Sequence, residues 1–393
     1  MQSKCNFISF LIEQHIFIEI SFHKLYNLFR KRLQWSEDMY GISIYLNEDV
    51  TEEVKQYIRR MHEIGFKGIF SSIHIPEDDS KLYLDRLGQL GSVAKDYEME
   101  LVVDVSGDAL KNLGIYYKDL TPLIELGVTG IRVDYGVSHE EIKLISEQVD
   151  VVLNASTISI EDLNILKELE VDFTSIEAWH NYYPRPETGL DKLEFINMNK
   201  WLKEKGITVM AFVPGEGDLR GPLFEGLPTL EDHRYKHSLG SALELRQTTF
   251  VDKVYIGDPG LSTYSQIQWE KYLNETVLYF EAVATSNTIE QLKHIEGRHT
   301  QRMDAARDVI RSQEARMRQD FIVKPEQMTE RTVGSITIDN SDYLRYEGEV
   351  QITKTNLPAD EKVNVIGYIQ SGDYLLLEAM RPGQPFEIQW KRG

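Results

Sequence analysis

Residues Met39-Tyr-Gly-Ile-Ser-Ile-Tyr45 begin a pattern that recurs along most of the chain. Each short run of apolar and β-branched residues is followed by a stretch with helical periodicity, which is typical of βα units and a parallel sheet. The strand-like runs are residues 41–46, 68–74, 101–105, 130–135, 151–155, 173–179, 208–213 and 253–257. Because eight such strands close a (β/α)8 barrel, the sequence predicts a TIM barrel over residues 39–285.

Helix signals between the strands support this interpretation. In residues 50–64 the apolar side chains repeat at helical spacing on one face, Asp49 begins a capping motif, and Gly65 ends the helix. Ser138 begins a similar motif after the fourth strand. Because the caps and the strands agree with each other, they favour the same fold.

The C-terminal part of the chain has a different pattern. We expect a helix-like stretch from residue 258 to about Ala284, and an all-β domain over residues 286–393. Apolar and polar residues alternate strongly in this domain, which predicts a small β-barrel. The clearest alternating runs are residues 335–339, 348–352, 363–367 and 374–377.

Residues 1–38 form an N-terminal extension that is unlike the rest of the chain. Their apolar run, residues 7–20, contains charged residues and makes a poor transmembrane helix. A basic cluster at residues 30–32 follows the run instead of preceding it, which argues against a signal peptide. We therefore expect the extension to be non-native or disordered, with translation starting at Met39.

The charge balance and the cysteine content exclude several classes of function. The 393 residues include 43 Lys and Arg against 63 Asp and Glu, for a net charge of −20. This charge repels nucleic acid and anionic membranes, so we expect neither as a general partner. Cys5 is the single cysteine, which excludes an internal disulfide and a cysteine-based zinc site. A cytoplasmic location is compatible with this composition.

The stretch Ser175-Ile-Glu-Ala-Trp-His-Asn-Tyr-Tyr-Pro-Arg-Pro-Glu-Thr-Gly-Leu190 begins like a buried strand and ends in a loop. Its prolines restrict the backbone, so the loop is stiff. Aromatic rings can hold the apolar faces of a sugar, while charged groups bind hydroxyls or an anion. From this stretch we predict a substrate-binding set of Trp179, His180, Tyr182, Tyr183 and Arg185.

Polar residues also end several predicted strands, where TIM-barrel active sites lie. Glycosidic cleavage needs two carboxyl groups, and we assign them to Asp134 and Glu177 at the ends of the fourth and sixth strands. Retaining and inverting mechanisms both stay open. The remaining predicted binding residues are His74, Asp104, Asn154 and Asp258, of which Asp104 and Asp258 are also reserve catalytic residues.

Metal, dinucleotide and anion binding are competing uses of these groups. His74, Asp104, His180 and Asp258 could converge on a divalent ion, but no H-x-H or H-E-x-x-H spacing occurs, so we predict no metal. The glycine-rich loop at residues 214–221 lacks the G-x-G-x-x-G spacing of a dinucleotide site. Its Arg220 follows the seventh strand, where TIM barrels often bind phosphate, so we predict an anion site there together with Arg185.

Several of these segments resemble the bacterial 6-phospho-N-acetylmuramidase family. The most specific is Ala178-Trp-His-Asn-Tyr-Tyr-Pro-Arg-Pro-Glu-Thr-Gly-Leu190, and the similarity runs from Met39 to near the C-terminus. The basic segment at residues 298–311 also looks like the junction between this family's domains. The other similar segments are residues 39–45, 70–74, 131–135, 154–156 and 255–259.

The resemblance implies a (β/α)8 domain followed by a cyclophilin-like β-barrel. It implies cytoplasmic hydrolysis of N-acetylmuramic acid 6-phosphate–N-acetylglucosamine in peptidoglycan recycling, with no organic cofactor. A phosphate on the substrate would explain why an acidic protein keeps arginines near its strand ends. Two other classes stay open: another TIM-barrel phosphosugar enzyme, such as an epimerase or a metal-dependent hydrolase, and a non-catalytic carbohydrate-binding protein. A homodimer also stays open.

Overall fold

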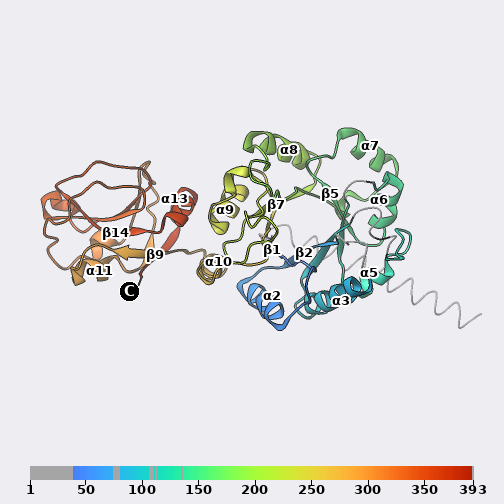
Figure 1. Ribbon diagram of the computed structural model, residues 1–393. Coiled ribbons are helices and arrows are strands. Elements are labelled where there is room, and N and C mark those ends of the chain that lie inside the picture. Colours follow the sequence, from blue (N-terminus) through green and yellow to red (C-terminus); the bar gives the residue numbers. More distant parts are fainter. Residues whose placement is uncertain (1–38, 74–79, 106–109, 111–112, 134–135, 392–393) are drawn as a thin grey trace, which may run out of the picture. The chain divides into compact units, whose positions relative to one another are not determined.

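The first part of the protein is a closed barrel of eight parallel strands, hydrogen-bonded in chain order (Figure 1). The computed structural model describes residues 39–391 except 74–79, 106–109, 111–112 and 134–135, so the predicted extension at residues 1–38 lies outside it. Residues from Tyr40 onward form one compact unit. The barrel strands are β1 (Met39–Ser43), β2 (Gly68–Ile73), β3 (Glu100–Val105), β4 (Gly130–Val133), β5 (Asp150–Asn154), β6 (Ile176–Trp179), β7 (Thr208–Val213) and β8 (Lys253–Ile256).

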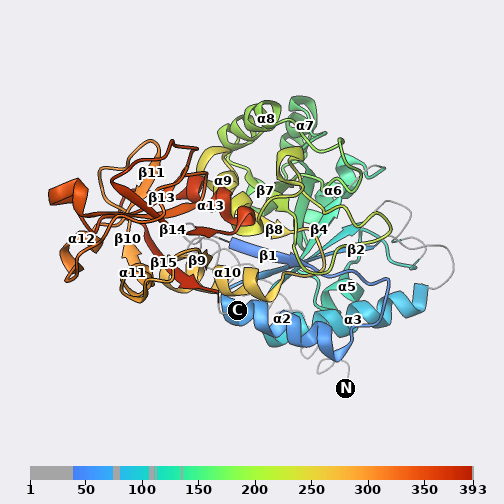
Figure 2. The same cartoon turned by 60° about the vertical axis from the view of Figure 1, so that its left-hand side comes forward.

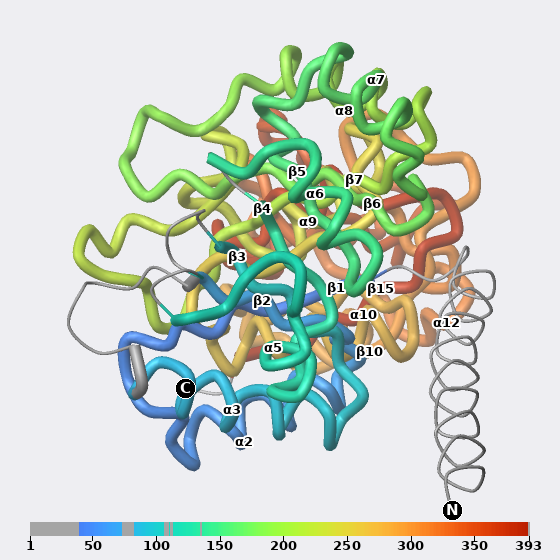
Figure 3. Tube along the Cα trace, turned by 90° about the vertical axis from the view of Figure 1, so that its right-hand side faces the viewer, coloured from blue at the N-terminus to red at the C-terminus, as the bar shows by residue number. Residues whose placement is uncertain are grey.

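Helices surround this barrel, and Figure 3 shows strands and helices following one another in chain order by colour. The helices are α2 (Glu52–Ile64), α3 (Ser80–Asp96), α5 (Thr121–Glu125), α6 (His139–Ser146), α7 (Ile160–Glu168), α8 (Lys192–Glu204), α9 (Ser238–Thr248) and α10 (Thr263–Glu275). None of the helices in the described residues is both long and apolar enough to cross a membrane.

The predicted TIM barrel is confirmed, and all eight predicted strands are present with small shifts at their ends. The N-terminus of α2 differs from the prediction, because Thr51 and not Asp49 is its cap and accepts from the backbone N–H of Val54 at 3.4 Å. Gly65 ends α2 at φ +118°, a left-handed conformation that glycine adopts without strain. Ser138 forms the predicted capping box at α6.

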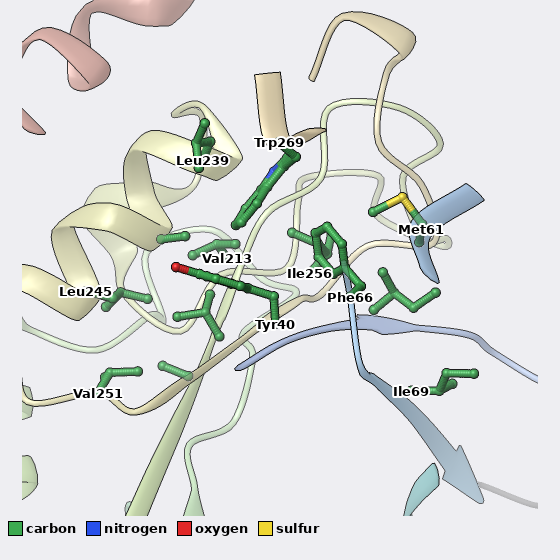
Figure 4. Close-up of a cluster of buried hydrophobic side chains, with 14 of the residues drawn as sticks. Tyr40, Met61, Phe66, Ile69, Val213, Leu239, Leu245, Val251, Ile256 and Trp269 are labelled. Carbon is green, nitrogen blue, oxygen red and sulfur yellow. The ribbon is translucent and has the colours of Figure 1, made fainter. Parts of the chain in front are cut away.

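Apolar side chains pack the helices against the outer face of the barrel. Figure 4 shows one such cluster, in which Tyr40 of β1 and Phe66 before β2 pack against Trp269 of α10, with ring centroids 4.9 Å and 5.0 Å from it. All three side chains are buried. Burying a large apolar side chain contributes about 1.5–3 kcal/mol, so such clusters supply much of the stability of the barrel wall.

Inside the barrel, every second residue of each strand points inward, and the side chains form layers. Apolar and aromatic side chains of the interior form one buried cluster, the aromatic layer, which consists of Phe70, Val102, Val152, Trp179, Met210, Phe212 and Tyr255. Tyr255 lies so close to Gly41 that a Cβ atom there would be 2.2 Å from its ring, so β1 requires glycine at this position. Below this layer, Lys253 forms ion pairs with Glu100 at 3.1 Å and Glu177 at 2.9 Å.

The second part of the protein is a seven-stranded mixed sheet that nearly closes into a barrel (Figure 2). Its strand order is β10-β15-β9-β14-β12-β13-β11, and an isolated bridge between Gln301 and Ser312 links the two edge strands. The strands are β9 (Leu278–Ala284), β10 (Gly297–Thr300), β11 (Val309–Arg311), β12 (Ser335–Asp339), β13 (Val350–Thr353), β14 (Val363–Ile369) and β15 (Pro385–Trp390). The short helices are α11 (Ile289–Ile295), α12 (Ala315–Arg318) and α13 (Tyr374–Ala379).

Two predictions for this region were wrong. Residues 278–284 are not helical but form β9 in the centre of the second sheet, so the sheet begins before the predicted boundary at residue 285. Residues 374–377 are not a strand but begin α13, whose leucines are buried. A short apolar run fits a buried helix as well as a strand, so periodicity alone cannot separate them. Leu375 of α13 packs against Gly240 of α9.

We predict that Asp339→Asn in β12 stabilises the protein at alkaline pH. Burial, with Glu349 and Asp360 nearby, raises the pKa of Asp339 from 3.8 to about 8. The unfolded chain loses this proton at lower pH than the folded protein, so stability falls as pH rises between the two values. We expect thermal unfolding to show a higher Tm for Asp339→Asn at about pH 9 and little gain at about pH 4. Equal gains at both values, or a gain in Asp342→Asn, whose aspartate is exposed, would contradict this cause.

Candidate active site

The mouth of the barrel, formed by the C-terminal ends of β1–β8 and the loops that follow them, holds two connected clusters of side chains. The Arg132 cluster consists of Asp104, Arg132 and Asn181. The Arg220 cluster consists of Tyr45, Tyr182 and Arg220. Asn181 and Tyr182 are consecutive residues after β6, so the two clusters belong to one site.

In the Arg132 cluster, a buried guanidinium holds a carboxylate and an amide. Arg132 is 3% exposed; its Nη1 donates to Asp104 Oδ1 at 2.9 Å and its Nη2 donates to Asn181 Oδ1. An arginine in a strand that is otherwise apolar is costly unless it is paired, and Asp104 supplies the opposite charge. The side chain of Asp104 remains 24% exposed. A carboxylate held by Arg132 is therefore accessible from the mouth.

In the Arg220 cluster, the guanidinium is held by two aromatic rings. It lies 3.7 Å from the centroid of Tyr45, and its Nη1 donates to the hydroxyl of Tyr182. The hydroxyl of Tyr45 donates to the carbonyl of Gly257 at 2.6 Å, and burial raises the pKa of this hydroxyl well above its usual value. Tyr182 packs edge-on against Phe212, with centroids 5.2 Å apart. Cation–π contact and hydrogen bonding together fix a cation at the mouth.

A buried carboxylate organises the loop that carries Arg220. Asp258 follows β8, is 1% exposed, and accepts backbone N–H groups from Gly215 at 3.0 Å, Leu227 at 2.9 Å and Arg220 at 3.3 Å. Burial raises the pKa of Asp258, and these hydrogen bonds oppose that shift. Both of its oxygens accept backbone N–H groups of the loop, so Asp258 holds this loop in place.

The loop after β6 is stiffened by an ion pair as well as by its prolines. Glu231 accepts the backbone N–H groups of Glu187 at 2.8 Å and Gly189 at 2.7 Å, and its ion pair with Arg234 helps to lower its pKa to about 2. Arg234 also donates to the carbonyl of Arg185 at 3.2 Å. The guanidinium of Arg185 is exposed and contacts the carbonyl of Pro186 at 3.5 Å. The structure therefore does not bring Arg185 into the Arg220 cluster.

Three residues predicted in the stretch 175–190 occupy positions other than those expected. Glu177 is the second residue of β6, not its last, and pairs with Lys253 below the aromatic layer while accepting from Trp179 Nε1 at 2.8 Å. Trp179 is fully buried in that layer. His180 points to α8, where its Nε2 lies 2.6 Å from Asn199 Oδ1, and burial lowers its pKa to about 4. Because β6 continues past Glu177 to Trp179, the Glu177 side chain lies inside the barrel and not at its mouth.

Comparison with known proteins identifies the family. Residues 40–271 match the family model described as 6-phospho-N-acetylmuramidase, N-terminal, and residues 277–389 match the model for the C-terminal part. The chain belongs to the 6-phospho-N-acetylmuramidase family. A search of the curated proteins found no match.

Two solved structures are similar over nearly the whole chain. A conserved protein of unknown function from Enterococcus faecalis is 45% identical, covering 90% of this chain and 96% of that chain, with a TM-score of 0.84. An uncharacterized B. cereus protein is 27% identical, covering 90% of this chain and 99% of that chain, with a TM-score of 0.68. Neither of these two proteins has an assigned activity in its description.

The remaining predicted residues have different outcomes in this family member. Asp134 and His74 lie outside the described residues, so their roles stay predictions. Asn154 is buried at the end of β5 and accepts the N–H of Ser156 at 3.0 Å. Tyr183 is half-buried, and its backbone N–H donates to Pro228.

Three of the four residues considered for metal binding lie within the part of the chain that the structure describes. None of their His, Cys, Asp and Glu side chains form a group of three or more that could hold a metal ion. Asp104 pairs with Arg132, Asp258 binds backbone N–H groups, and His180 contacts Asn199. Three of the four residues considered for metal binding therefore have separate partners.

Three residues at the mouth of the barrel were not predicted as site residues from the sequence. Arg132 and Tyr45 lie in residues 131–135 and 39–45, which resemble the family, and Asn181 lies in the loop after β6. A usable signal was present for Arg132, because a charge within an apolar barrel strand must point into the interior and needs a partner. That partner, Asp104, comes from the neighbouring strand and can be found only from the strand pairing.

We predict that Glu177→Gln lowers stability more than it lowers turnover. The change removes one of two carboxylates that pair with buried Lys253, which should cost about 1–3 kcal/mol. Thermal unfolding should show a lower Tm, as it should for the matched variant Glu100→Gln. Turnover of the phosphorylated disaccharide per folded molecule should stay near that of the wild type. A loss of several orders of magnitude at unchanged Tm would instead place Glu177 in the mechanism.

Proposed function

We propose that the protein is a cytoplasmic glycoside hydrolase that cleaves N-acetylmuramic acid 6-phosphate–N-acetylglucosamine in peptidoglycan recycling. Membership of the 6-phospho-N-acetylmuramidase family supports the substrate and the reaction. One observation carries the proposal: an accessible carboxylate, Asp104, and a fixed guanidinium, Arg220, lie in one connected site. Arg132 bonds Asp104 to Asn181, and the next residue, Tyr182, accepts a hydrogen bond from Arg220. A carboxylate can take part in cleaving the glycosidic bond, and a guanidinium at the same mouth can bind the anionic group of the sugar.

Asp104 takes over the catalytic role first predicted for Glu177. Glycosidic cleavage needs one carboxylic acid to protonate the leaving oxygen and one carboxylate to act as nucleophile or base. Arg132 faces Asp104 with a permanent positive charge, which favours the ionised carboxylate and so the second role. We assign the acid role to Asp134, which follows the last residue of β4 in the sequence. β4 pairs with β3, the strand that carries Asp104.

Arg220 is our candidate for the 6-phosphate of the substrate. A guanidinium binds phosphate through paired N–H donors, and this one is already held in place by Tyr45 and Tyr182. Arg220 also follows β7, where TIM barrels often bind phosphate. Recognition at this position would let the enzyme select phosphorylated disaccharide.

We predict that Asp104→Asn and Asp134→Asn each lower turnover of the phosphorylated disaccharide by about 10²–10⁴-fold, because each removes an acid–base or nucleophilic group. Purified variants with native Tm should be compared by product release. Asp252→Asn is the matched control, since Asp252 pairs with Lys203 at the other end of the barrel. Near-normal turnover in either mouth variant would remove that residue from the mechanism.

The same assay tests two of the alternatives that the sequence left open, a metal-dependent hydrolase and a carbohydrate-binding protein. Loss of wild-type turnover on adding a chelator would favour a metal-dependent hydrolase. Binding of the disaccharide without cleavage would favour a carbohydrate-binding protein.

For Arg220→Ala we expect loss of discrimination between phosphorylated and unphosphorylated disaccharide. The KM for the phosphorylated form should rise by about tenfold or more, because a charge-assisted contact of about 1.5–3 kcal/mol is lost. Arg185→Ala is the matched control, since that exposed arginine lies outside the cluster. An equal loss on both disaccharides in Arg220→Ala would argue against a phosphate role, and a phosphate-specific loss in Arg185→Ala would restore the prediction for that residue.

A further inference from the structure

The loop between β7 and α9 carries Arg220 and is held by a buried carboxylate. Asp258 Oδ2 accepts the N–H groups of Gly215 and Leu227, and Oδ1 accepts the N–H of Arg220 itself. These donors lie near the start, near the end and beyond the end of the glycine-rich segment 214–221. A carboxylate that accepts several backbone N–H groups is strongly bonded and fixes all the segments that donate to it.

The loop backbone also lies directly on the segment after β8. A Cβ atom on Gly215 would be 2.4 Å from the carbonyl oxygen of Gly260, and one on Gly217 would be 2.8 Å from the carbonyl carbon of Leu261. The N–H of Gly217 donates to Gly260 at 3.2 Å. Glycine is therefore required at both positions, because any side chain would lift the loop away from the segment that carries Asp258.

Glu216 ties the same loop to the barrel helices. Its Oε1 accepts the backbone N–H of Ser238, the first residue of α9. A carboxylate at a helix N-terminus is stabilised by the helix dipole. Because this loop is hydrogen-bonded to Asp258 and to the first residue of α9, the backbone of Arg220 has little freedom.

We propose that Asp258 is a positioning residue that presents the Arg220 guanidinium to the phosphate of the substrate. The inference rests on the proposed function and extends it to a residue that does not touch the sugar. Asp258 is 1% exposed and bonded through both oxygens, so it acts through the loop. Tyr45 and Tyr182 then fix the far end of the Arg220 side chain. With both ends held before the substrate arrives, little entropy is lost on phosphate binding.

The test compares Asp258→Asn with Asp252→Asn, an aspartate that accepts the N–H of Val209 at 2.8 Å away from the mouth. The carboxamide introduced by Asp258→Asn has one acceptor oxygen, so it can accept fewer of the three hydrogen bonds. We expect the KM for phosphorylated disaccharide to rise about tenfold in Asp258→Asn. The effect on unphosphorylated disaccharide should be several-fold smaller, and Asp252→Asn should show no such difference.

A double-mutant cycle separates positioning from general damage. If Asp258 acts through Arg220, adding Asp258→Asn to Arg220→Ala should change the phosphate-dependent KM ratio by less than twofold. Additive effects of the two substitutions would overturn the proposal, as would an equal fall in kcat on both disaccharides.

Should Asp258→Asn fail to fold, Gly217→Ala tests the same loop, because its Cβ would clash with Leu261 while the Asp258 carboxylate stays intact. The same phosphate-specific loss is expected from it, and an unchanged KM would overturn the proposal.

Calorimetric titration with inorganic phosphate distinguishes this inference from the proposed function. If the wild type cleaves neither disaccharide, weaker phosphate binding in both Asp258→Asn and Arg220→Ala would still support positioning. Equal binding in wild type and variants would refute it.

Discussion

A charge inside a closed barrel must be paired, and this constraint sets the partners of the acids inside this barrel. The interior excludes water, so an unpaired carboxylate or guanidinium there would cost several kcal/mol. Lys253 pairs with Glu100 and Glu177 on one side of the aromatic layer, and Arg132 pairs with Asp104 on the other. The two sets look alike in sequence, since each is a charge within an apolar strand. They differ in position along their strands, because Asp104 lies near the C-terminal end of β3, whereas Glu100 begins that strand and Glu177 is the second residue of β6.

The mouth therefore combines a rigid support with a few accessible groups. Arg132 orients Asp104 and Asn181, while Asp258 fixes the loop that carries Arg220. The backbone after β6 joins the two clusters, and the pair of Glu231 with Arg234 stiffens the continuation of that backbone. Few of the groups that shape the site are exposed. This is the arrangement expected where positioning and preorganised charge contribute most of the catalytic effect.

Much of the fold could be predicted from the sequence, and the errors have identifiable causes. The short apolar, β-branched runs and the helical patterns between them indicated all eight barrel strands, because parallel strands that are covered by helices are buried on both faces. The prediction failed at residues 278–284 and 374–377, which are a strand and a helix respectively. Both runs are apolar and short, so neither periodicity distinguishes them. The sheet and helix packing around them selects the conformation.

For the site, the sequence by itself determined which kinds of residue are present and the family to which the chain belongs. It indicated that Asp104, Tyr182 and Arg220 lie near strand ends, and the structure gathers these three at one mouth. Only the tertiary structure decided that Glu177 lies beneath the aromatic layer and that Asp258 supports a loop. The reason is that a side chain's role depends on its height within the barrel and on its partner from another strand. Strand pairing and stagger set both, and neither can be read from one strand alone.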